Sequence, residues 1–190
     1  MGRMTTRSLT DEEYKDIIET IRNGYIDKGI EHRPNEQIAT ILVLEANLGC
    51  RIGDIIKLRT DSIVKDGAFY KLNITEEKTG KKRTFIVPEP VRKYIEKYAK
   101  QYNRDGELFT ITCQAVWKAI RQVCEYLELE NVSTHSFRKT CACRIYENSG
   151  HDIEAVCEFL QHSDIKITRH YIKRSDAQLE NAITKSVNLV

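Results

Sequence analysis

Four side chains between residues 133 and 171 suit chemistry on a phosphate ester. His135 and Arg138 are three residues apart at the start of an expected helix. His162 follows after a second expected helix, and Tyr171 comes nine residues later. A guanidinium holds phosphate oxygens through a fork of hydrogen bonds, and a tyrosine hydroxyl becomes a nucleophile when a neighbouring base takes its proton. The set therefore predicts attack on a phosphodiester without a metal ion.

Each of these residues also has a structural explanation when it is taken alone. A histidine at a helix N-terminus, such as His135, is often satisfied by backbone groups, and His162 could be a core histidine at a helix end. Tyr171 is one of nine tyrosines, and the others are interpreted mostly as core or amphipathic-face residues. His170 is interpreted as structural. Only the joint pattern favours a reactive site over these explanations.

A second arginine follows a helix whose apolar residues are almost continuous. Residues 38–48, IATILVLEANL, predict a buried central helix, and Gly49 is expected to end it. Arg51 comes directly afterwards and is expected to point towards the interior edge of the domain. Alone, it would be a structural arginine paired with Asp54 or with a carbonyl. Beside the histidines and the tyrosine, it supplies a second guanidinium for phosphoryl transfer.

Residues 62–87 change to a period of two. SIV, GAFYKLNIT and KRTFIVP are short β-branched and aromatic runs, separated by turns at residues 66–67 and 79–80. They predict a small three-stranded antiparallel sheet. Lys78 lies at the second turn, where a hairpin tip can extend it like a finger. A solvated turn lysine is the default interpretation, and a proton donor is the functional one.

These positions together resemble the catalytic domain of the tyrosine recombinases, the phage and transposon integrases. The resemblance covers about residues 8 to 185. The family's order is matched by Arg51 in ANLGCRIGDIIKL, Lys78 in EEKTGKKRTFIVP, His135 and Arg138 in THSFRKT, and His162 and Tyr171 in FLQHSDIKITRHY. Gly53, Lys139 and Gln161 depart from the family's common residues, and none of them removes a catalytic group.

The resemblance implies a role for each matched residue. It assigns Tyr171 as the nucleophile, Arg51 and Arg138 as stabilisers of the phosphate charge, His135 as the acceptor or relay of the tyrosine proton, Lys78 as the acid for the leaving 5′ oxygen, His162 as a hydrogen-bond partner of a phosphate oxygen, and Asp54 as a support for the site. It also implies a 3′-phosphotyrosyl intermediate that stores the bond energy. Neither ATP, a metal ion nor another cofactor is then expected.

The cations of the chain are concentrated in one region. Residues 78–104 hold nine Lys or Arg against two Glu, whereas residues 1–50 hold nine acids against six Lys or Arg. A solvated helix face explains part of the basic run, and a surface that binds phosphates explains it as well. The residues predicted to contact DNA are Lys81, Lys82, Arg83, Lys93 and Lys97. The expected partner is double-stranded DNA, on which the resemblance implies a homo-tetramer that is weakly associated or monomeric without DNA.

The expected fold is α+β and mainly helical, with a small three-stranded antiparallel sheet. Residues 8–190 are expected to form a catalytic domain with an amphipathic tail helix from about residue 175. Residues 1–7 are expected to be a disordered lead or a cloning remnant, and the family's N-terminal core-binding domain is expected to be absent. Near the start, a capping box of Thr10 and Glu13 begins a helix whose apolar stripe runs to Tyr25, and residues 29–35 are expected to form a loop.

Composition bounds the compartment in which the chain is expected to work. Hydrophobic residues make up 41% and charged residues 31% of the sequence, and no apolar run reaches the roughly 18–20 residues of a membrane span. The first ten residues lack the apolar core of a signal peptide. Most of the six cysteines lie in helical, partly apolar contexts, and Cys141 and Cys143 are spaced for neither a redox pair nor zinc, so buried reduced thiols are expected. We therefore expect a prokaryotic cytoplasmic protein, without membrane contact, that associates with the nucleoid when bound to DNA.

The function predicted from these observations is site-specific DNA recombination through Tyr171, in the integration or excision of a mobile element. A type IB topoisomerase shares the chemistry but relaxes DNA as a monomer. A DNA-binding module that keeps the fold without cutting is an alternative of a different class. The small size and the tail after the tyrosine favour the recombinase over the topoisomerase, and the full set of reactive side chains disfavours the non-cutting module.

Overall fold

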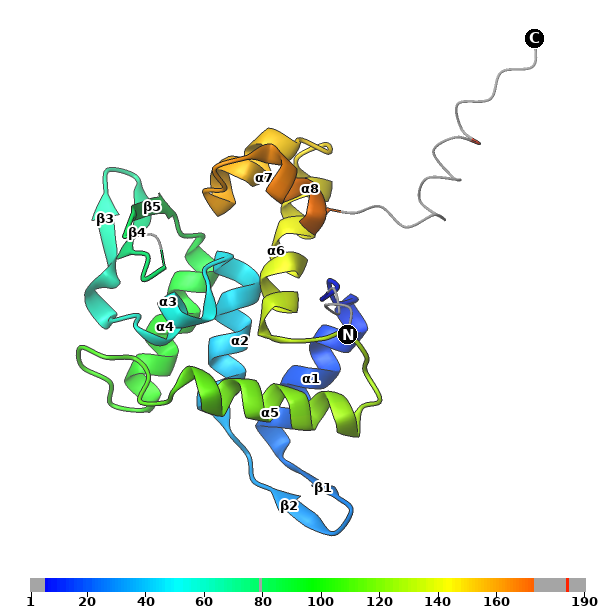
Figure 1. Ribbon diagram of the computed structural model, residues 1–190. Helices are drawn as coiled ribbons and strands as arrows, with labels where there is room; N and C mark the ends of the chain where they lie inside the picture. Colours follow the sequence, from blue (N-terminus) through cyan, green and yellow to red (C-terminus); the bar gives the residue numbers. More distant parts are fainter. Residues whose placement is uncertain (1–5, 79, 173–183, 185–190) are drawn as a thin grey trace.

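The computed structural model describes residues 6–78, 80–172 and 184. It is a mainly helical body with a small three-stranded antiparallel sheet at one side (Figure 1), which confirms the predicted fold class. The elements in chain order are α1 (Asp11–Asn23), β1 (Tyr25–Asp27), β2 (Ile30–His32), α2 (Glu36–Leu48), α3 (Ile52–Ile56), the 3₁₀ turn η1 (Thr60–Ser62), β3 (Ile63–Asp66), β4 (Phe69–Thr75), β5 (Lys82–Ile86), α4 (Glu89–Gln101), α5 (Cys113–Tyr126), α6 (Thr134–Asn148), α7 (Ile153–Leu160) and α8 (Ile165–Tyr171).

Helix α2 is the centre of the body, as its apolar sequence predicts. Asn35 caps it by accepting a hydrogen bond from the Ile38 amide at 3.0 Å, and Gly49 ends it in the left-handed region at φ 56°. Helices α1 and α6 pack against it (Figure 1). Leu42 and Leu48 are fully buried, at 0% exposed. Truncation of such a side chain to alanine typically costs about 2–5 kcal/mol, so this packing fixes the position of the α2 end.

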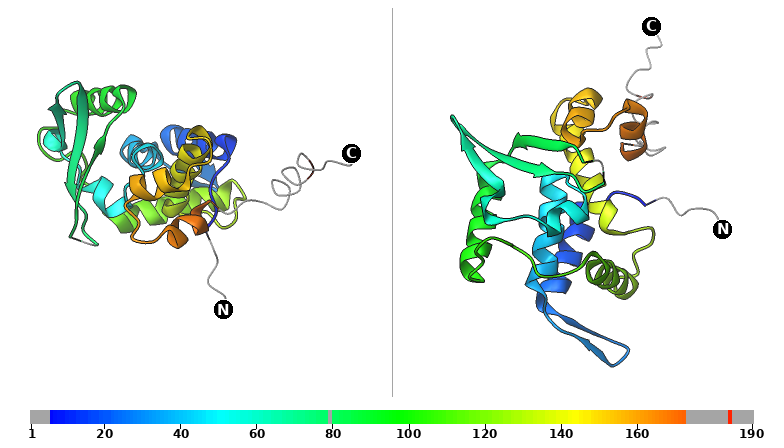
Figure 2. Two further views of the ribbon diagram at one scale, coloured as in Figure 1. Left: turned by 90° about the horizontal axis from the view of Figure 1, so that it is seen from above. Right: turned by 60° about the vertical axis from the view of Figure 1, so that its left-hand side comes forward.

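The sheet has the order β3-β4-β5, and all its pairs are antiparallel. Leu72 on the middle strand pairs with Ile63 on one side and with Phe85 on the other. Side chains alternate between faces along a strand, so Leu72 and Phe85 turn inwards. Arg83, two residues from Phe85, turns inwards with it. The sheet and α4 lie on one side of the molecule in both views of Figure 2.

The segment after α1 is a hairpin, which corrects the prediction of a helix stripe to Tyr25 and of a loop. Helix α1 ends at Asn23, because Gly24 adopts φ 71° and a Cβ there would lie 2.5 Å from the His32 carbonyl oxygen. Strands β1 and β2 then pair and project from the body (Figures 1 and 2). The Tyr25 ring stacks on the His32 ring with centroids 4.3 Å apart. A glycine-permitted backbone turn therefore overrides the helical spacing of Tyr25.

The domain also begins earlier than predicted. The Arg7 amide donates to the Asn131 carbonyl at 3.0 Å, and its guanidinium pairs with Glu13 at 2.6 Å. The Lys139 ammonium donates to the Thr6 carbonyl. Thr6 and Arg7 therefore belong to the folded domain and not to a disordered lead. The predicted tail helix from about residue 175 lies outside the described residues.

All six cysteines are free thiols. In the part of the chain that the structure describes, the longest helices are too short or too polar to cross a membrane.

Candidate active site

The loop from α2 to α3 is the floor of the candidate site. The left-handed conformation of Gly49 turns the chain so that Arg51 becomes the N-cap of α3. A Cβ on Gly49 would lie 2.8 Å from the Phe159 ring and 3.1 Å from the Leu160 side chain. Glycine is therefore required here both by conformation and by the close approach of α7. Its carbonyl faces the start of α6.

Arg51 is held at the rim by a buried carboxylate at the base of the β4–β5 hairpin. Its Nη1 donates to Glu76 Oε2 at 2.6 Å, and Glu76 is only 2% exposed. The Arg51 side chain itself is 27% exposed, so part of it remains accessible at the rim. Asp54 is 5% exposed and accepts a hydrogen bond from the Glu77 amide at 2.9 Å. Asp54 thus ties α3 to the hairpin that carries Lys78.

Arg138 forms the deepest part of the site. It lies one turn after His135 on α6, on the same face, and is 0% exposed. Its Nη1 donates to the Gly49 carbonyl at 2.6 Å, and its Nη2 donates to the Leu160 carbonyl at 3.1 Å. A guanidinium has five N–H donors, so these bonds orient the group without using all its donors. Arg138 thereby joins α6 to the ends of α2 and α7.

Tyr171 is brought to His135 by the short helix α8. The tyrosine hydroxyl and His135 Nε2 are 2.5 Å apart. The ring centroids of Tyr171 and His135 are 5.1 Å apart in an edge-on arrangement, and those of Tyr171 and His162 are 4.9 Å apart. Thr168 on α8 is fully buried and bonded to His162. Residues 36 positions apart in the sequence thus place a phenol hydroxyl and an imidazole nitrogen within hydrogen-bond distance, an arrangement that can activate a nucleophile.

His135 is held in its neutral form. Burial is the main cause that lowers the pKa of His135 to about 4, and the positive charges of Arg138 and Lys139 add to it. A neutral imidazole can accept a proton on Nε2 when Nδ1 carries the hydrogen. His135 can therefore act as a base towards Tyr171 at neutral pH.

His162 has a defined tautomer. Its Nε2 lies 3.3 Å from Arg138 Nη2 and its Nδ1 lies 2.9 Å from Thr168 Oγ1. Because a guanidinium only donates, Nε2 accepts and Nδ1 carries the hydrogen that points to Thr168. Burial, followed by the charge of Arg138, lowers the pKa of His162 to about 4. In this state His162 orients Arg138; a bound phosphate would favour the imidazolium, which can donate from Nε2.

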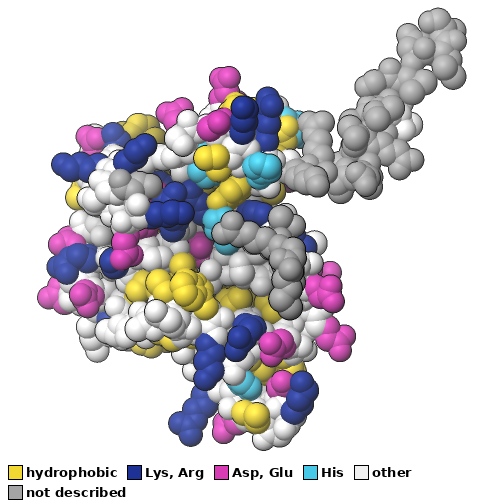
Figure 3. Space-filling model, viewed as in Figure 1, with side chains coloured by type: hydrophobic (Ala, Val, Ile, Leu, Met, Phe, Trp, Pro, Cys, Tyr) yellow, Lys and Arg dark blue, Asp and Glu magenta, His cyan; other side chains and the backbone are white. Residues whose placement is uncertain are grey.

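The site carries more positive than negative charge. Three guanidiniums, those of Arg51, Arg83 and Arg138, lie among the two buried carboxylates of Glu76 and Asp54. Both histidines are neutral. Lys, Arg and His side chains gather on this face between the sheet and helices α7 and α8 (Figure 3). Such a surplus of positive charge in a partly dehydrated site favours the binding of an anion.

Glu45 on α2 adds little to the negative side of this balance. It is 1% exposed, and burial raises its pKa well above the ordinary value, although the charge of Arg138 acts in the opposite direction. The carboxyl therefore favours its neutral form. The sequence of an apolar helix gave no functional signal for this residue.

The predicted lysines lie at the surface, whereas Arg83, which was also predicted to contact DNA, is buried. Lys78 is exposed in the turn between β4 and β5, and its charge is among the causes that lower the pKa of His135. The predicted DNA-contacting residues that are exposed are Lys81, Lys82, Lys93 and Lys97. Arg83 is 0% exposed, because strand alternation places it on the inner face of β5. The prediction that Arg83 contacts DNA is therefore wrong.

Sequence reasoning missed two residues that contact the predicted set. Glu76 pairs with Arg51, but a carboxylate near a hairpin turn is ordinarily solvated, so the sequence carried no signal for it. Lys139 places its ammonium 5.6 Å from the centroid of the Tyr171 ring. Lys139 did carry a sequence signal, because it departs from the residue that the family commonly has directly after Arg138.

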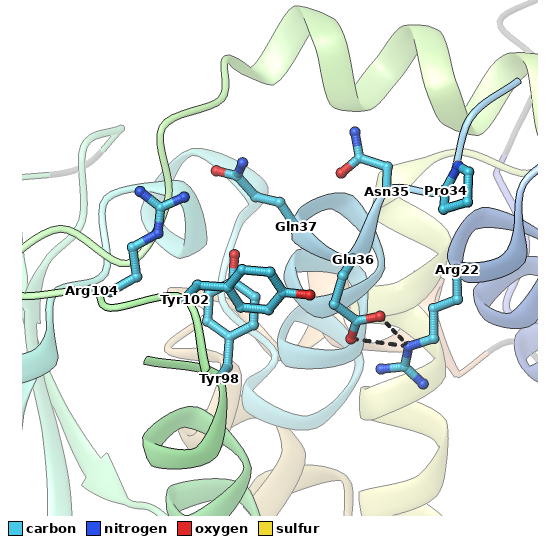
Figure 4. Close-up of a pocket in the computed structure, with 8 residues that line it drawn as sticks. All are labelled: Arg22, Pro34, Asn35, Glu36, Gln37, Tyr98, Tyr102 and Arg104. Atoms are coloured by element: carbon cyan, nitrogen blue, oxygen red, sulfur yellow. Dashed lines mark hydrogen bonds and ion pairs between the residues drawn. The ribbon is translucent and has the colours of Figure 1, made fainter. Parts of the chain in front are cut away.

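A separate pocket of about 450 Å³ lies between the end of α1, the start of α2 and the end of α4 (Figure 4). Its lining consists of Arg22, Pro34, Asn35, Glu36, Gln37, Tyr98, Tyr102 and Arg104. Arg22 Nε pairs with Glu36 Oε2 at 2.9 Å within it. The lining includes no predicted site residue, so this pocket is distinct from the candidate active site.

The chain matches a known protein family over most of its length. The sequence model of the Phage integrase family matches residues 7–178. The chain belongs to this family. Among curated members, it is 25% identical to the tyrosine recombinase XerA of Pyrococcus furiosus, over 95% of this chain and 62% of XerA. It is 27% identical to the probable integrase/recombinase YoeC of Bacillus subtilis, over 73% of this chain and 78% of YoeC. The chain thus spans less than two thirds of the length of XerA.

Solved structures of family members share the fold. The XerH site-specific recombinase in a post-cleavage complex with a palindromic difH substrate matches with a TM-score of 0.74 at 17% identity, over 97% of this chain and 54% of that one. The catalytic domain of bacteriophage HP1 integrase matches with a TM-score of 0.65 at 20% identity, over 95% of both chains. The architecture described above is therefore that of the family's catalytic domain.

Proposed function

We propose that this chain cuts and rejoins DNA as a site-specific recombinase, through a covalent 3′-phosphotyrosyl link to Tyr171. One observation carries the proposal: the Tyr171 hydroxyl lies 2.5 Å from Nε2 of a neutral His135. Two arginines lie in the same site: Arg51 pairs with the Glu76 carboxylate, and Arg138 donates to backbone carbonyls. A nucleophile, a base and a surplus of cations are what transfer of a phosphodiester requires. Membership of the Phage integrase family supports this assignment.

The geometry supports a defined order of bond changes. Tyr171 Oη gives its proton to His135 Nε2 and forms a bond to the scissile phosphorus. The bond from phosphorus to the 5′ oxygen breaks, and that oxygen takes a proton, for which Lys78 is the proposed donor. Arg51 and Arg138 meet the charge on the non-bridging oxygens. The phosphotyrosine keeps the bond energy, so the reverse steps with a new 5′ hydroxyl rejoin the strand.

His162 and Asp54 are proposed to support these steps. His162 holds Arg138 through Nε2 in the free protein and would donate to a phosphate oxygen once protonated. Asp54 holds the backbone at the base of the Lys78 hairpin.

The proposed partner is double-stranded DNA. Exposed Lys81 and Lys82 on the hairpin, and Lys93 and Lys97 on α4, are proposed to contact its phosphates. Lys93 is paired with Glu89 at 2.8 Å, but both side chains are about two thirds exposed, so a phosphate can compete for it. We further propose four copies on DNA, weak association or monomers without it, and a role in mobile-element integration or excision in a prokaryotic cytoplasm, with nucleoid association when bound.

A nicked suicide substrate tests the proposal. The nick lets a short 5′ fragment diffuse away after cleavage, so the covalent protein–DNA adduct accumulates. Wild-type protein should form the adduct, Tyr171→Phe should form none, and the exposed-tyrosine control Tyr126→Phe should match wild type. An adduct that survives Tyr171→Phe would remove Tyr171 as the nucleophile. DNA binding without any adduct would favour the non-cutting module, whereas relaxation of supercoiled DNA without strand exchange would favour the topoisomerase.

A further inference from the structure

Arg83 joins three segments that carry catalytic groups. It lies on the inner face of β5 and is 0% exposed. Its Nη2 donates to the Phe159 carbonyl at 2.7 Å and to the Leu48 carbonyl at 3.3 Å, and its Nη1 donates to the Gly49 carbonyl at 3.2 Å. The hairpin strand, the end of α2 and the end of α7 therefore meet at one guanidinium.

Arg83 shares one hydrogen-bond acceptor with Arg138 and one ion-pair partner with Arg51. The Gly49 carbonyl also accepts from Arg138 Nη1, at 2.6 Å. Glu76 Oε1 lies 3.8 Å from Arg83 Nη1, while Glu76 Oε2 accepts from Arg51 at 2.6 Å. A displacement of Arg83 must therefore disturb the Gly49 carbonyl that Arg138 uses and the charge environment of the Glu76 carboxylate that Arg51 uses.

The orientation of this guanidinium is fixed by aromatic side chains. Its Cζ lies 4.5 Å from the Phe85 ring centroid and 5.5 Å from the Phe159 ring centroid. The two rings are edge-on to each other, with centroids 5.4 Å apart. A lysine ammonium in this space would keep the charge, but it lacks the planar fork that reaches several carbonyls at once.

The arrangement is electrostatically costly. Burial is the main cause that lowers the pKa of Arg138, and the charge of Arg83 adds to that effect. Placing a second buried guanidinium beside Arg138 therefore opposes folding. A hydrophobic side chain of similar volume would often serve stability equally well, so stability alone gives no reason for an arginine here.

We propose that Arg83 is a positioning residue for DNA cleavage. It holds Arg51, through Glu76, and Arg138, through the Gly49 carbonyl, in the spacing that a phosphate requires, and it does not touch DNA itself. This inference rests on the proposed function.

The test compares two substrates in Arg83→Met and Arg83→Lys. One substrate carries the normal scissile phosphodiester, and the other carries a methylphosphonate, which lacks the charged non-bridging oxygen that the arginines meet. At saturating DNA, Arg83→Met should slow adduct formation about 10–100-fold on the phosphodiester and less than about 3-fold on the methylphosphonate, each relative to wild type. Arg83→Lys should remain slow on the phosphodiester, because the fork and not the charge is lost. DNA affinity should change by less than about 3-fold.

Thr84→Val is the matched control. Thr84 is the next residue on β5, is exposed, and donates from Oγ1 to Asn73 Oδ1 at 2.8 Å, away from the candidate site. It should cleave both substrates like wild type. Equal slowing of Arg83→Met on both substrates would overturn the proposal, as would full activity of Arg83→Lys. Failure of both variants to fold would overturn it in favour of a role in stability alone.

A second readout needs no cleavage. The Nε–H of Arg138 is buried and has no hydrogen-bond partner among the described residues, so its ¹⁵N–¹H signal reports the position of this group. In Arg83→Met this signal should shift or broaden, while that of Arg22, held by Glu36 elsewhere, stays unchanged. If wild type forms no adduct, the proposed function fails, and this spectrum alone decides the inference: an unchanged Arg138 signal overturns it.

Discussion

Replacing His135 by alanine should slow cleavage of the DNA strand without preventing DNA binding. The Tyr171 hydroxyl loses the acceptor that lies 2.5 Å away in the wild type. A positioned general base contributes about 10²–10⁴-fold to a rate, which corresponds to about 3–5 kcal/mol of activation free energy. His135 contacts the tyrosine, whereas in the proposed mechanism the arginines meet the charge on the phosphate. We therefore expect a loss of about 10²–10⁴-fold in rate, with a small change in affinity.

The assay is single-turnover formation of the covalent adduct on the nicked suicide substrate, with protein in excess over DNA. His170→Ala is the matched control, since His170 adjoins Tyr171 in sequence but is exposed. Added imidazole should partly restore cleavage by His135→Ala, because truncation leaves space beside the tyrosine hydroxyl. The restored rate should rise with pH as free imidazole loses its proton, near a pKa of about 6.5 for an unperturbed histidine-like ring.

Two results would refute this reasoning. Cleavage by His135→Ala within about 3-fold of wild type would mean that another group takes the tyrosine proton, since a base is worth at least about 10²-fold. An equal loss of binding and cleavage, without rescue by imidazole, would mean that His135 supports the fold of the α6 start and has no role as a base.

Lys78→Ala should slow cleavage of a normal phosphodiester. A substrate with sulfur in place of the 5′ oxygen should recover most of the rate, since a thiolate leaves without protonation. Slow cleavage of both substrates would mean that Lys78 is not the acid. Joint Lys93→Glu and Lys97→Glu exchange should weaken DNA binding and reduce the slope of log affinity against log salt by about 1–2, with unchanged thermal unfolding; an unchanged slope would place both lysines off the DNA. Glu45 has a raised folded pKa, so its contribution to stability is fully present below the pKa of the unfolded chain and is lost as pH rises towards the folded pKa. Urea unfolding of Glu45→Gln should lack this fall, which one group limits to about 1.4 kcal/mol per pH unit; parallel curves for variant and wild type would refute it.

Several features of the fold followed from local sequence chemistry. The Asn35 cap and the Gly49 stop of α2 were predictable because a side-chain acceptor and a left-handed glycine act within a few residues. The period of two along residues 62–87 predicted the antiparallel sheet. The same alternation could have placed Arg83 inside with Phe85. The count of cations concealed this, because it adds up charge without regard to the face of a strand.

By itself, the sequence determined which residue types are present and in what order: a tyrosine, two histidines, two arginines and a hairpin lysine. Only the tertiary structure decided how they meet. Tyr171 reaches His135 through α8, and Arg51 meets Glu76 across the hairpin base. Protonation states were also decided there, because burial beside cations lowers the pKa of His135 to about 4. Such effects depend on distances and dehydration between segments far apart in the chain, and local spacing carries no information about either.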